Sequence, residues 1–151
     1  MGYYLQSAAS QTTATNVQIQ MGSTGTSAAQ EWTMSANTDG TYSFKAYTGY
    51  YMSMRASGNS ASVKSSSSLG DTEKFYITVV DETWCLQSKK YSNYLGVGKG
   101  GKNYTYGYTS CSSSLNSRWT PILVSSIIDY TKYIGLEIAL QAYDSSYVGP
   151  W

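Results

Sequence analysis

The sequence predicts an all-β fold made of three similar units, each with four short strands. Two residue patterns recur along the 151 residues at nearly constant spacing. One is a tyrosine followed by an apolar residue, with steps of 47 and 43 residues, at Tyr4-Leu5, Tyr51-Met52 and Tyr94-Leu95. The other is a single large aromatic, with steps of 43 and 44 residues, at Trp32, Phe75 and Trp119. A fixed period of this length indicates internal repeats.

We assign the repeats to residues 1–48, 49–91 and 92–151 of one domain that spans the chain. Within each unit, short alternating runs are broken by Ser, Thr, Gly and Asn, and no helical period is sustained. The first unit contains strands at 3–7, 16–21, 31–36 and 41–47. Asn37-Thr38-Asp39-Gly40 joins the last two as a hairpin turn, because Gly40 can adopt a positive φ.

The second and third units repeat this order of strands. In the second unit the strands are predicted at 50–54, 61–65, 74–79 and 83–88, with a turn at Val80-Asp81-Glu82. In the third they are predicted at 94–97, 104–108, 118–124 and 136–143, and the connection 125–135 is longer than its counterparts.

Four strands taken three times predict a β-trefoil, in which six strands close a short barrel and six form hairpins that cap one end. Closure removes exposed sheet edges, which explains how a chain with few charges can stay soluble. The predicted core has three residues from each unit: Leu5, Trp32, Phe44, Met52, Phe75, Leu86, Leu95, Trp119 and Leu140.

The composition argues against several classes of function. Only 13% of the residues are charged and the net charge is +1, so neither a nucleic-acid surface nor an acidic tail is expected. Sixteen tyrosines offer apolar faces and hydroxyl groups, a combination that suits recognition of neutral polar ligands. Tyrosine is also a common strand residue, and many of the sixteen are expected to serve only the sheet.

No catalytic constellation is visible. The chain has no histidine, which removes the commonest general base, and its nine carboxylates are not paired by the repeat. We therefore expect neither an enzyme nor a cofactor or metal site. Spatial pairs of carboxylates cannot be seen in a sequence, so a two-carboxylate glycosidase stays as a minor alternative.

Cys85 and Cys111 are too few for a disulfide framework, and we expect two ordinary thiols. The chain opens without a basic segment followed by an apolar run, and no apolar stretch approaches the roughly 20 residues of a membrane span. These features predict a protein that does not insert into membranes, and that is cytoplasmic or secreted without a signal peptide.

Several motifs resemble those of ricin-type β-trefoil lectins, particularly the small fungal ones. The similarity runs from the first unit into the start of the second through Gln30-Glu31-Trp32, Asp39-Gly40-Thr41-Tyr42 and Gly49-Tyr50-Tyr51-Met52, in the family's order. The third unit is similar through Asn93-Tyr94-Leu95-Gly96, Tyr106-Gly107-Tyr108 and Asn116-Ser117-Arg118-Trp119. The resemblance implies a trefoil that binds carbohydrate, without a cofactor.

The chain also departs from this family. Galactose-binding members have an aspartate after the apolar residue of the opening strand, and here those places hold Gln6, Ser53 and Gly96. The resemblance therefore implies that the usual galactose site is absent from all three units. The middle unit is also similar to fascin-like trefoils, which bundle actin, and fungal trefoil protease inhibitors share the fold, so the fold alone does not decide the function.

The third unit is the candidate site. Tyr106 and Tyr108 lie on one outer face if Thr105 and Gly107 point inward. Tyr108 falls where the family often has its stacking aromatic, and Asn116 matches the family's polar residue ahead of the core tryptophan. With Tyr94 and Asn93 they form the predicted carbohydrate-binding set. The alternative is that these tyrosines merely cover the barrel.

We interpret the chain as a lectin whose partners are glycans or glycoproteins, with up to three shallow sites. Agglutination would need at least two working units or a homodimer. A protease inhibitor acting through the 125–135 connection is the main alternative. An actin-binding protein is disfavoured because actin is acidic and this chain carries little net positive charge.

Overall fold

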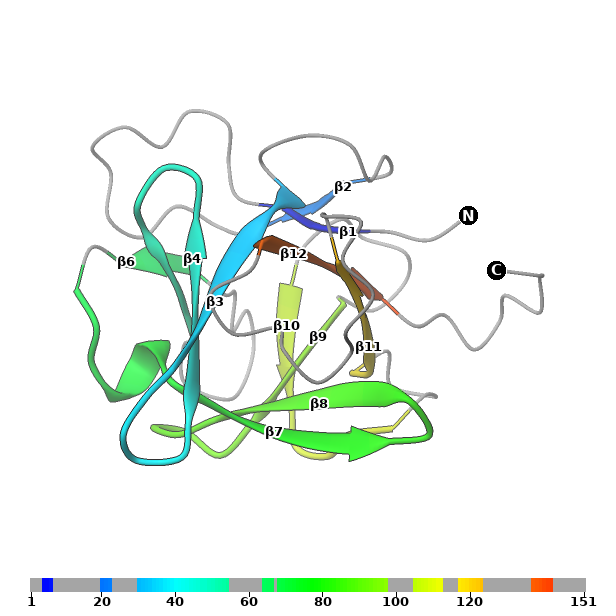
Figure 1. Cartoon of the computed structure of the whole chain (residues 1–151). Helices are drawn as coiled ribbons and strands as arrows, with labels where there is room; N and C mark the ends of the chain where they lie inside the picture. The colour runs from blue at the N-terminus through cyan, green and yellow to red at the C-terminus, as the bar shows by residue number, and fades with distance from the viewer. Residues whose placement is uncertain are drawn as a thin grey trace.

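The computed structural model describes residues 4–6, 20–22, 30–54, 64–66, 68–97, 105–112, 117–123 and 137–142. These residues form twelve strands and the short 3-10 turn η2 (Asp71–Glu73). The strands are β1 (Tyr4–Gln6), β2 (Gln20–Gly22), β3 (Trp32–Ala36), β4 (Tyr42–Ala46), β5 (Tyr51–Ser53), β6 (Lys64–Ser66), β7 (Phe75–Val80), β8 (Thr83–Ser88), β9 (Tyr94–Val97), β10 (Thr105–Tyr108), β11 (Trp119–Leu123) and β12 (Glu137–Ala142). Figure 1 shows their arrangement.

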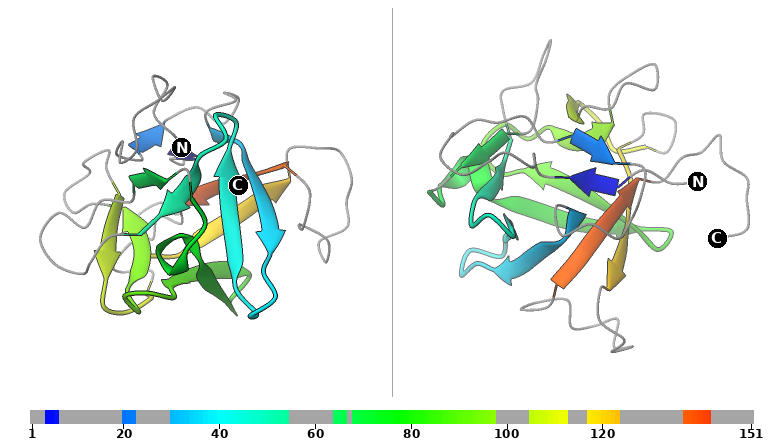
Figure 2. Two further views of the ribbon diagram at one scale, coloured as in Figure 1. Left: turned by 90° about the vertical axis from the view of Figure 1, so that its left-hand side faces the viewer. Right: turned by 90° about the horizontal axis from the view of Figure 1, so that it is seen from above.

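The predicted β-trefoil is confirmed, and the strand pairing repeats three times. All twelve strands belong to one antiparallel sheet that surrounds a common centre (Figure 2). The tyrosine that opens a unit pairs each time with the last strand of a neighbouring unit, as Tyr4 with Gln141 of the third unit, Tyr51 with Lys45 of the first and Tyr94 with Gln87 of the second. The large aromatics repeat in the same way, as Trp32 with Ile138, Phe75 with Tyr42 and Trp119 with Trp84.

All nine residues of the predicted core are confirmed, since none exposes more than 1% of its surface. The structure adds further buried apolar residues, among them Met34, Met54, Trp84 and Ile138. Most of these additions lie on the predicted strands, where every second residue faces the interior.

The indole groups of the first and third units also hold the barrel by hydrogen bonds. Trp32 Nε1 donates to the carbonyl oxygen of Leu5 at 3.1 Å, and Trp119 Nε1 donates to that of Leu95 at 2.9 Å. Each bond joins the aromatic of a unit to the opening strand of the same unit. Phe75 has no such donor, and it packs edge-on against Phe44 with ring centroids 6.0 Å apart.

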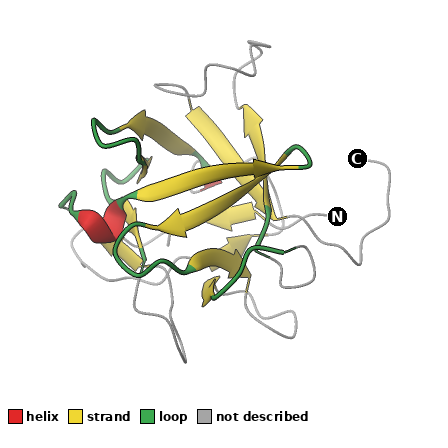
Figure 3. Cartoon of the chain, turned by 90° about the horizontal axis from the view of Figure 1, so that it is seen from below, coloured by secondary structure: helices red, strands yellow, loops and turns green. Residues whose placement is uncertain are grey.

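The hairpin turns follow the prediction in the first two units. Gly40 has φ of 81°, as expected for the turn between β3 and β4. The turn between β7 and β8 instead uses Asp81 and Glu82, with φ of 50° and 64°. Seen from below, this second hairpin lies in front, and η2 leads into its first strand (Figure 3).

A charged network ties the first unit to the second. Asp39, in the β3–β4 turn, lies 2.8 Å from Lys89 Nζ and 3.3 Å from Lys74 Nζ, and Lys89 also lies 3.1 Å from Asp71. The ammonium of Lys89 and the hydroxyl of Thr41 hold the pKa of Asp39 well below its usual range. Asp39 and then Asp71 raise the pKa of Lys89 above its usual range.

The indole hydrogen bond of Trp119 should contribute to stability beyond its packing. In Trp119→Phe, the buried carbonyl oxygen of Leu95 loses this donor and the smaller ring leaves a cavity. We expect a loss of about 2–4 kcal/mol in the free energy of unfolding, measured by urea denaturation. A loss below about 0.5 kcal/mol would show that neither the bond nor the ring volume matters.

The network around Asp39 should be lost in acid. Because the pKa of Asp39 is lower in the folded state, its contribution is present above the unfolded value of about 4 and disappears as the pH falls through the folded value. Asp39→Asn should therefore lower the midpoint of urea unfolding between about pH 5 and pH 9, and the difference from wild type should shrink below about pH 4. Asp81→Asn is the control. The ion pair of Asp81 with Arg118 is long, at 3.6 Å, and highly exposed, so it should contribute little to stability at any pH. A pH-independent difference for Asp39→Asn would contradict this role.

Candidate functional site

The predicted tyrosines lie on one face of the β9–β10 hairpin. Thr105 is fully buried and Gly107 is also inside, so the expected inward direction of these two residues is confirmed. Alternation then places Tyr106 and Tyr108 together on the other face, and their ring centroids are 4.9 Å apart at 59°. Tyr108 is directly opposite Tyr94 on β9, so the third tyrosine belongs to the same face.

Tyr108, however, is not open to a ligand. Its side chain is buried, with 5% of the residue exposed, and its hydroxyl donates to the carbonyl oxygen of Val97. The expectation that Tyr108 is exposed and stacks directly on a ligand is therefore wrong. Its ring packs against that of Tyr106, so Tyr108 supports Tyr106.

Tyr106 and Tyr94 carry the accessible part of this face, since each is partly exposed. Tyr106 is paired across the hairpin with Gly96, which has no side chain to occupy the space beside the ring. Tyr94 is flanked on its other side by Gln87 of β8. The face therefore presents two tyrosines over a buried third, with an amide side chain at its margin.

The two predicted asparagines do not join this face as expected. Asn93 is buried, with 2% exposed, and its backbone carbonyl oxygen accepts a hydrogen bond from the Ser88 N–H at 2.8 Å. A direct contact between Asn93 and a surface ligand is therefore wrong, because the residue holds the β8–β9 turn. Asn116 lies outside the described residues, and its predicted role stays a prediction.

In the second unit, Ser53 stands where galactose-binding lectins have an aspartate, and this position is not accessible to a ligand. Ser53 is buried and its hydroxyl donates to Glu73 Oε2 at 2.5 Å, and Thr72 donates to the same oxygen. Glu73 Oε1 accepts from the Gly70 N–H at 2.8 Å. These donors satisfy the buried carboxylate, so it serves the local structure of η2 and is not presented to a ligand.

In the third unit, the side chain of Ser117 holds a loop beside the candidate site through hydrogen bonds to its backbone. Its hydroxyl accepts from the Ser112 N–H at 2.9 Å and lies 3.1 Å from the carbonyl oxygen of Ser110. These contacts hold the segment that directly follows Tyr108 against the residue two positions before Trp119. The loop at the end of β10 is thereby fixed to the start of β11.

A disulfide fixes the same loop to the second unit. Cys85 on β8 and Cys111 after β10 are bonded, with their Cα atoms 5.9 Å apart, so the expectation of two free thiols is wrong. Strand β8 also pairs with β9 and β11, and the bond therefore fastens the loop after β10 to the strand on the far side of β9. Strand β10 is thus restrained along its length by pairing with β9, and the loop that follows it is restrained by the disulfide.

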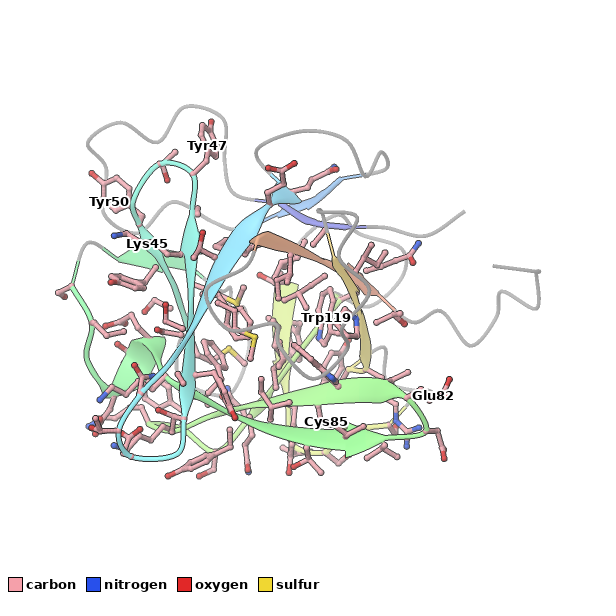
Figure 4. The ribbon with its side chains drawn as sticks, viewed as in Figure 1. Lys45, Tyr47, Tyr50, Glu82, Cys85 and Trp119 are labelled. Atoms are coloured by element: carbon pink, nitrogen blue, oxygen red, sulfur yellow. A yellow bond between two sulfur atoms is a disulfide. The ribbon has the colours of Figure 1, made fainter. Side chains whose placement is uncertain are left out.

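A second aromatic surface lies at the β4–β5 turn. Tyr47 is 54% exposed, and Tyr50 and Tyr51 are partly exposed. Lys45 Nζ lies 5.5 Å from the centre of the Tyr51 ring, within the range of a cation–π contact. Figure 4 shows Lys45, Tyr47 and Tyr50 near the same end of this hairpin. The tyrosines at the ends of the corresponding strands of the other two units are Tyr91 and Tyr143; Tyr91 packs against the core and Tyr143 lies outside the described residues.

The described part of the chain contains no group of three or more His, Cys, Asp or Glu side chains that could hold a metal ion. Nor does that part contain a helix long and apolar enough to cross a membrane. The aromatic faces of the two tyrosine surfaces can stack on a ligand, and their hydroxyl groups can hydrogen-bond to it.

No protein-family model matches this sequence, and no curated protein sequence matches it. The structure is similar to solved β-trefoils. The designed threefold-symmetric protein ThreeFoil aligns with a TM-score of 0.67 and 19% identity, over 79% of this chain and 96% of that one. This likeness, at low identity, shows the fold.

Two of the similar structures contain saccharides. The Polyporus squamosus lectin, bound to the epitope Neu5Acα2-6Galβ1-4GlcNAc, aligns with a TM-score of 0.60 and 19% identity, over 79% of this chain and 47% of the lectin. The chain thus spans about half of that lectin's length. SeviL, bound to the asialo-GM1 saccharide, aligns with a TM-score of 0.57 and 16% identity, over 79% and 94% of the two chains.

The disulfide should contribute strongly to stability and to the order of the β10 loop. It closes a loop across 26 positions. The loop-closure model gives about 3–4 kcal/mol for a loop of this size. The double variant Cys85→Ser with Cys111→Ser should lose this amount in urea unfolding, whereas the reducing agent dithiothreitol should destabilise only the wild type. Two titratable thiols in the non-reduced, denatured wild type would contradict the bond.

Proposed function

We propose that this protein is a carbohydrate-binding lectin, and that the outer face of the β9–β10 hairpin is a glycan site. One observation carries the proposal: Tyr106 and Tyr94 are partly exposed on a rigid face, above a third tyrosine whose hydroxyl is already bonded. The saccharides bound to two proteins of the same fold support this class of ligand.

The geometry suits a sugar because a pyranose ring has an apolar face and a rim of hydroxyl groups. The ring of Tyr106 would stack on the apolar face, and its hydroxyl and that of Tyr94 would bond the rim. Tyr108 contributes by fixing the orientation of Tyr106, since its own movement is restrained by the bond to Val97. Such a preorganised ring loses little conformational freedom on binding.

We further propose that the protein acts by binding alone, without catalysis. Its ligands would be glycans or glycoproteins, and each site would be shallow and weak, with affinities of ~mM to ~μM. Strong attachment to a glycan-bearing surface would then come from several sites acting together, which can raise avidity by roughly 10²-fold or more.

The Cys85–Cys111 bond bears on where such binding takes place. Disulfides persist mainly in oxidising environments, and extracellular glycans are found there as well. Of the two locations that the sequence left open, we therefore favour secretion.

The proposal is tested in two stages. A glycan array on the purified protein identifies a ligand, and a soluble monovalent form of that ligand is then titrated calorimetrically. Tyr106→Ala should weaken monovalent binding by about 1–3 kcal/mol, because it removes the stacking ring and one hydroxyl. Tyr108→Phe should weaken it less, because the supporting ring remains while the anchoring bond to Val97 is lost.

Two surface tyrosines serve as controls in the same titration. Tyr76→Ala removes an exposed ring on β7 and should leave the affinity unchanged. Tyr47→Ala removes the exposed ring of the β4–β5 turn and distinguishes the two aromatic surfaces. A loss with Tyr47→Ala and none with Tyr106→Ala would move the site to that turn. Absence of binding to every glycan would overturn the function itself.

A further inference from the structure

Gln87 extends the tyrosine face of the β9–β10 hairpin onto the neighbouring strand β8. It pairs with Tyr94 across the β8–β9 ladder, and Tyr94 pairs with Tyr108 across the β9–β10 ladder. Residues opposite each other in antiparallel strands place their side chains on the same face of the sheet. These three residues therefore form one row across three strands, and Tyr106, two residues before Tyr108, lies on the same face. Gln87 is partly exposed in this row.

The side-chain amide of Gln87 is held in one orientation. Its Nε2 donates a hydrogen bond to the backbone carbonyl oxygen of Ser92 at 3.1 Å. Because a carbonyl oxygen only accepts hydrogen bonds, the amide nitrogen faces Ser92 and Oε1 faces away from it. The described residues provide no donor to this Oε1, so the atom is left to accept a hydrogen bond from a ligand.

The turn between β8 and β9 fixes the carbonyl group that anchors this amide. The Ser92 N–H donates to the carbonyl oxygen of Ser88 at 2.9 Å, and the Ser88 N–H donates to that of Asn93 at 2.8 Å. The Tyr91 N–H donates to the Ser88 hydroxyl at 3.2 Å. Because the turn is tied together in this way, Gln87 presents its acceptor with little ordering left to occur on binding.

The distance between Gln87 and Tyr106 sets the length of a ligand that reaches both. They lie on strands two spacings apart, about 10 Å, because neighbouring strands are roughly 4.8 Å apart. A sugar ring stacked on Tyr106 leaves the space beside Gln87 and Tyr94 for a second ring. Resting on the glycan site proposed above, we infer that this site binds two linked sugar residues. The first stacks on Tyr106, and the second lies beside Tyr94 and donates a hydroxyl hydrogen bond to Gln87 Oε1.

The other two units do not offer this acceptor. Lys45 takes the place of Gln87 beside Tyr51, and its ammonium group, 5.5 Å from the centre of the tyrosine ring, can only donate. Gln141 takes the same place beside Tyr4, but it is buried, with 6% exposed. A two-residue site of this kind therefore belongs to the β8–β9–β10 face.

The test is an NMR titration of the full-length protein with named saccharides. Methyl β-D-glucopyranoside and methyl β-D-galactopyranoside are the single-residue probes, and cellobiose, maltose and lactose are the two-residue probes. At least one disaccharide should bind roughly tenfold more tightly than the methyl glycoside of its terminal sugar, because it adds a hydrogen bond and a contact. That disaccharide should shift the side-chain amide signal of Gln87, and the methyl glycoside should not.

Variants assign the gain in affinity to the amide. Gln87→Met keeps the length of the side chain and removes the acceptor, so it should weaken disaccharide binding roughly five- to tenfold and leave methyl glycoside binding unchanged. Tyr106→Ala should weaken the binding of both probes. Lys90→Met is the matched control, because it makes the same replacement at an exposed position of the β8–β9 turn, and it should change neither affinity. Thermal unfolding checks that each variant is folded.

The outcomes separate this inference from the function on which it rests. A disaccharide affinity that falls with Tyr106→Ala and is unchanged by Gln87→Met would overturn the two-residue site and leave the proposed glycan site standing. Equal affinities for disaccharides and methyl glycosides would do the same. If none of the five saccharides binds, the inference is also overturned, and the glycan array still decides the proposed function.

Discussion

Burial of one large aromatic in each unit is the constraint on which the rest of the structure depends. Trp32, Phe75 and Trp119 are enclosed at equivalent places, and each lies where the first strand of its hairpin meets the strand of a neighbouring unit. Two of them also bond the opening strand through their indole nitrogen. Packing therefore acts at all three points and hydrogen bonding reinforces two of them, and the strands between them need only short apolar alternation to complete the barrel.

The residue two positions before each aromatic shows how the symmetric core allows the units to differ. Gln30, Glu73 and Ser117 occupy this place, and all three are buried. Glu73 gathers donors from η2 and β5, whereas Ser117 gathers the backbone of the loop after β10. A buried polar group must find partners, so each choice imposes a different loop on the outside of the barrel.

The strands and core were predictable from the sequence because alternation and repeat spacing report directly on which residues face inward. Alternation also placed Tyr106 and Tyr108 on one face. It could not show that the side chain of Tyr108 is buried, because its burial depends on how it packs against Tyr106 and on its hydrogen bond to Val97. The burial of Asn93 could not be predicted either, because it also depends on the packing around the β8–β9 turn. The Cys85–Cys111 bond was missed because it joins different units, and spacing along the chain says nothing of that distance.

The third unit differs from the second through a few substitutions around an unchanged scaffold. Gly96 lies opposite Tyr106, while the equivalent place in the second unit holds Ser53, which is committed to Glu73. A residue without a side chain leaves room for a ring, and the ring then needs support, which Tyr108 supplies. The disulfide and Ser117 secure the loop that follows Tyr108. A partly exposed tyrosine is thus held in place by the strand, by the supporting ring and by the loop, which is the preorganisation that the proposed stacking on a sugar ring requires.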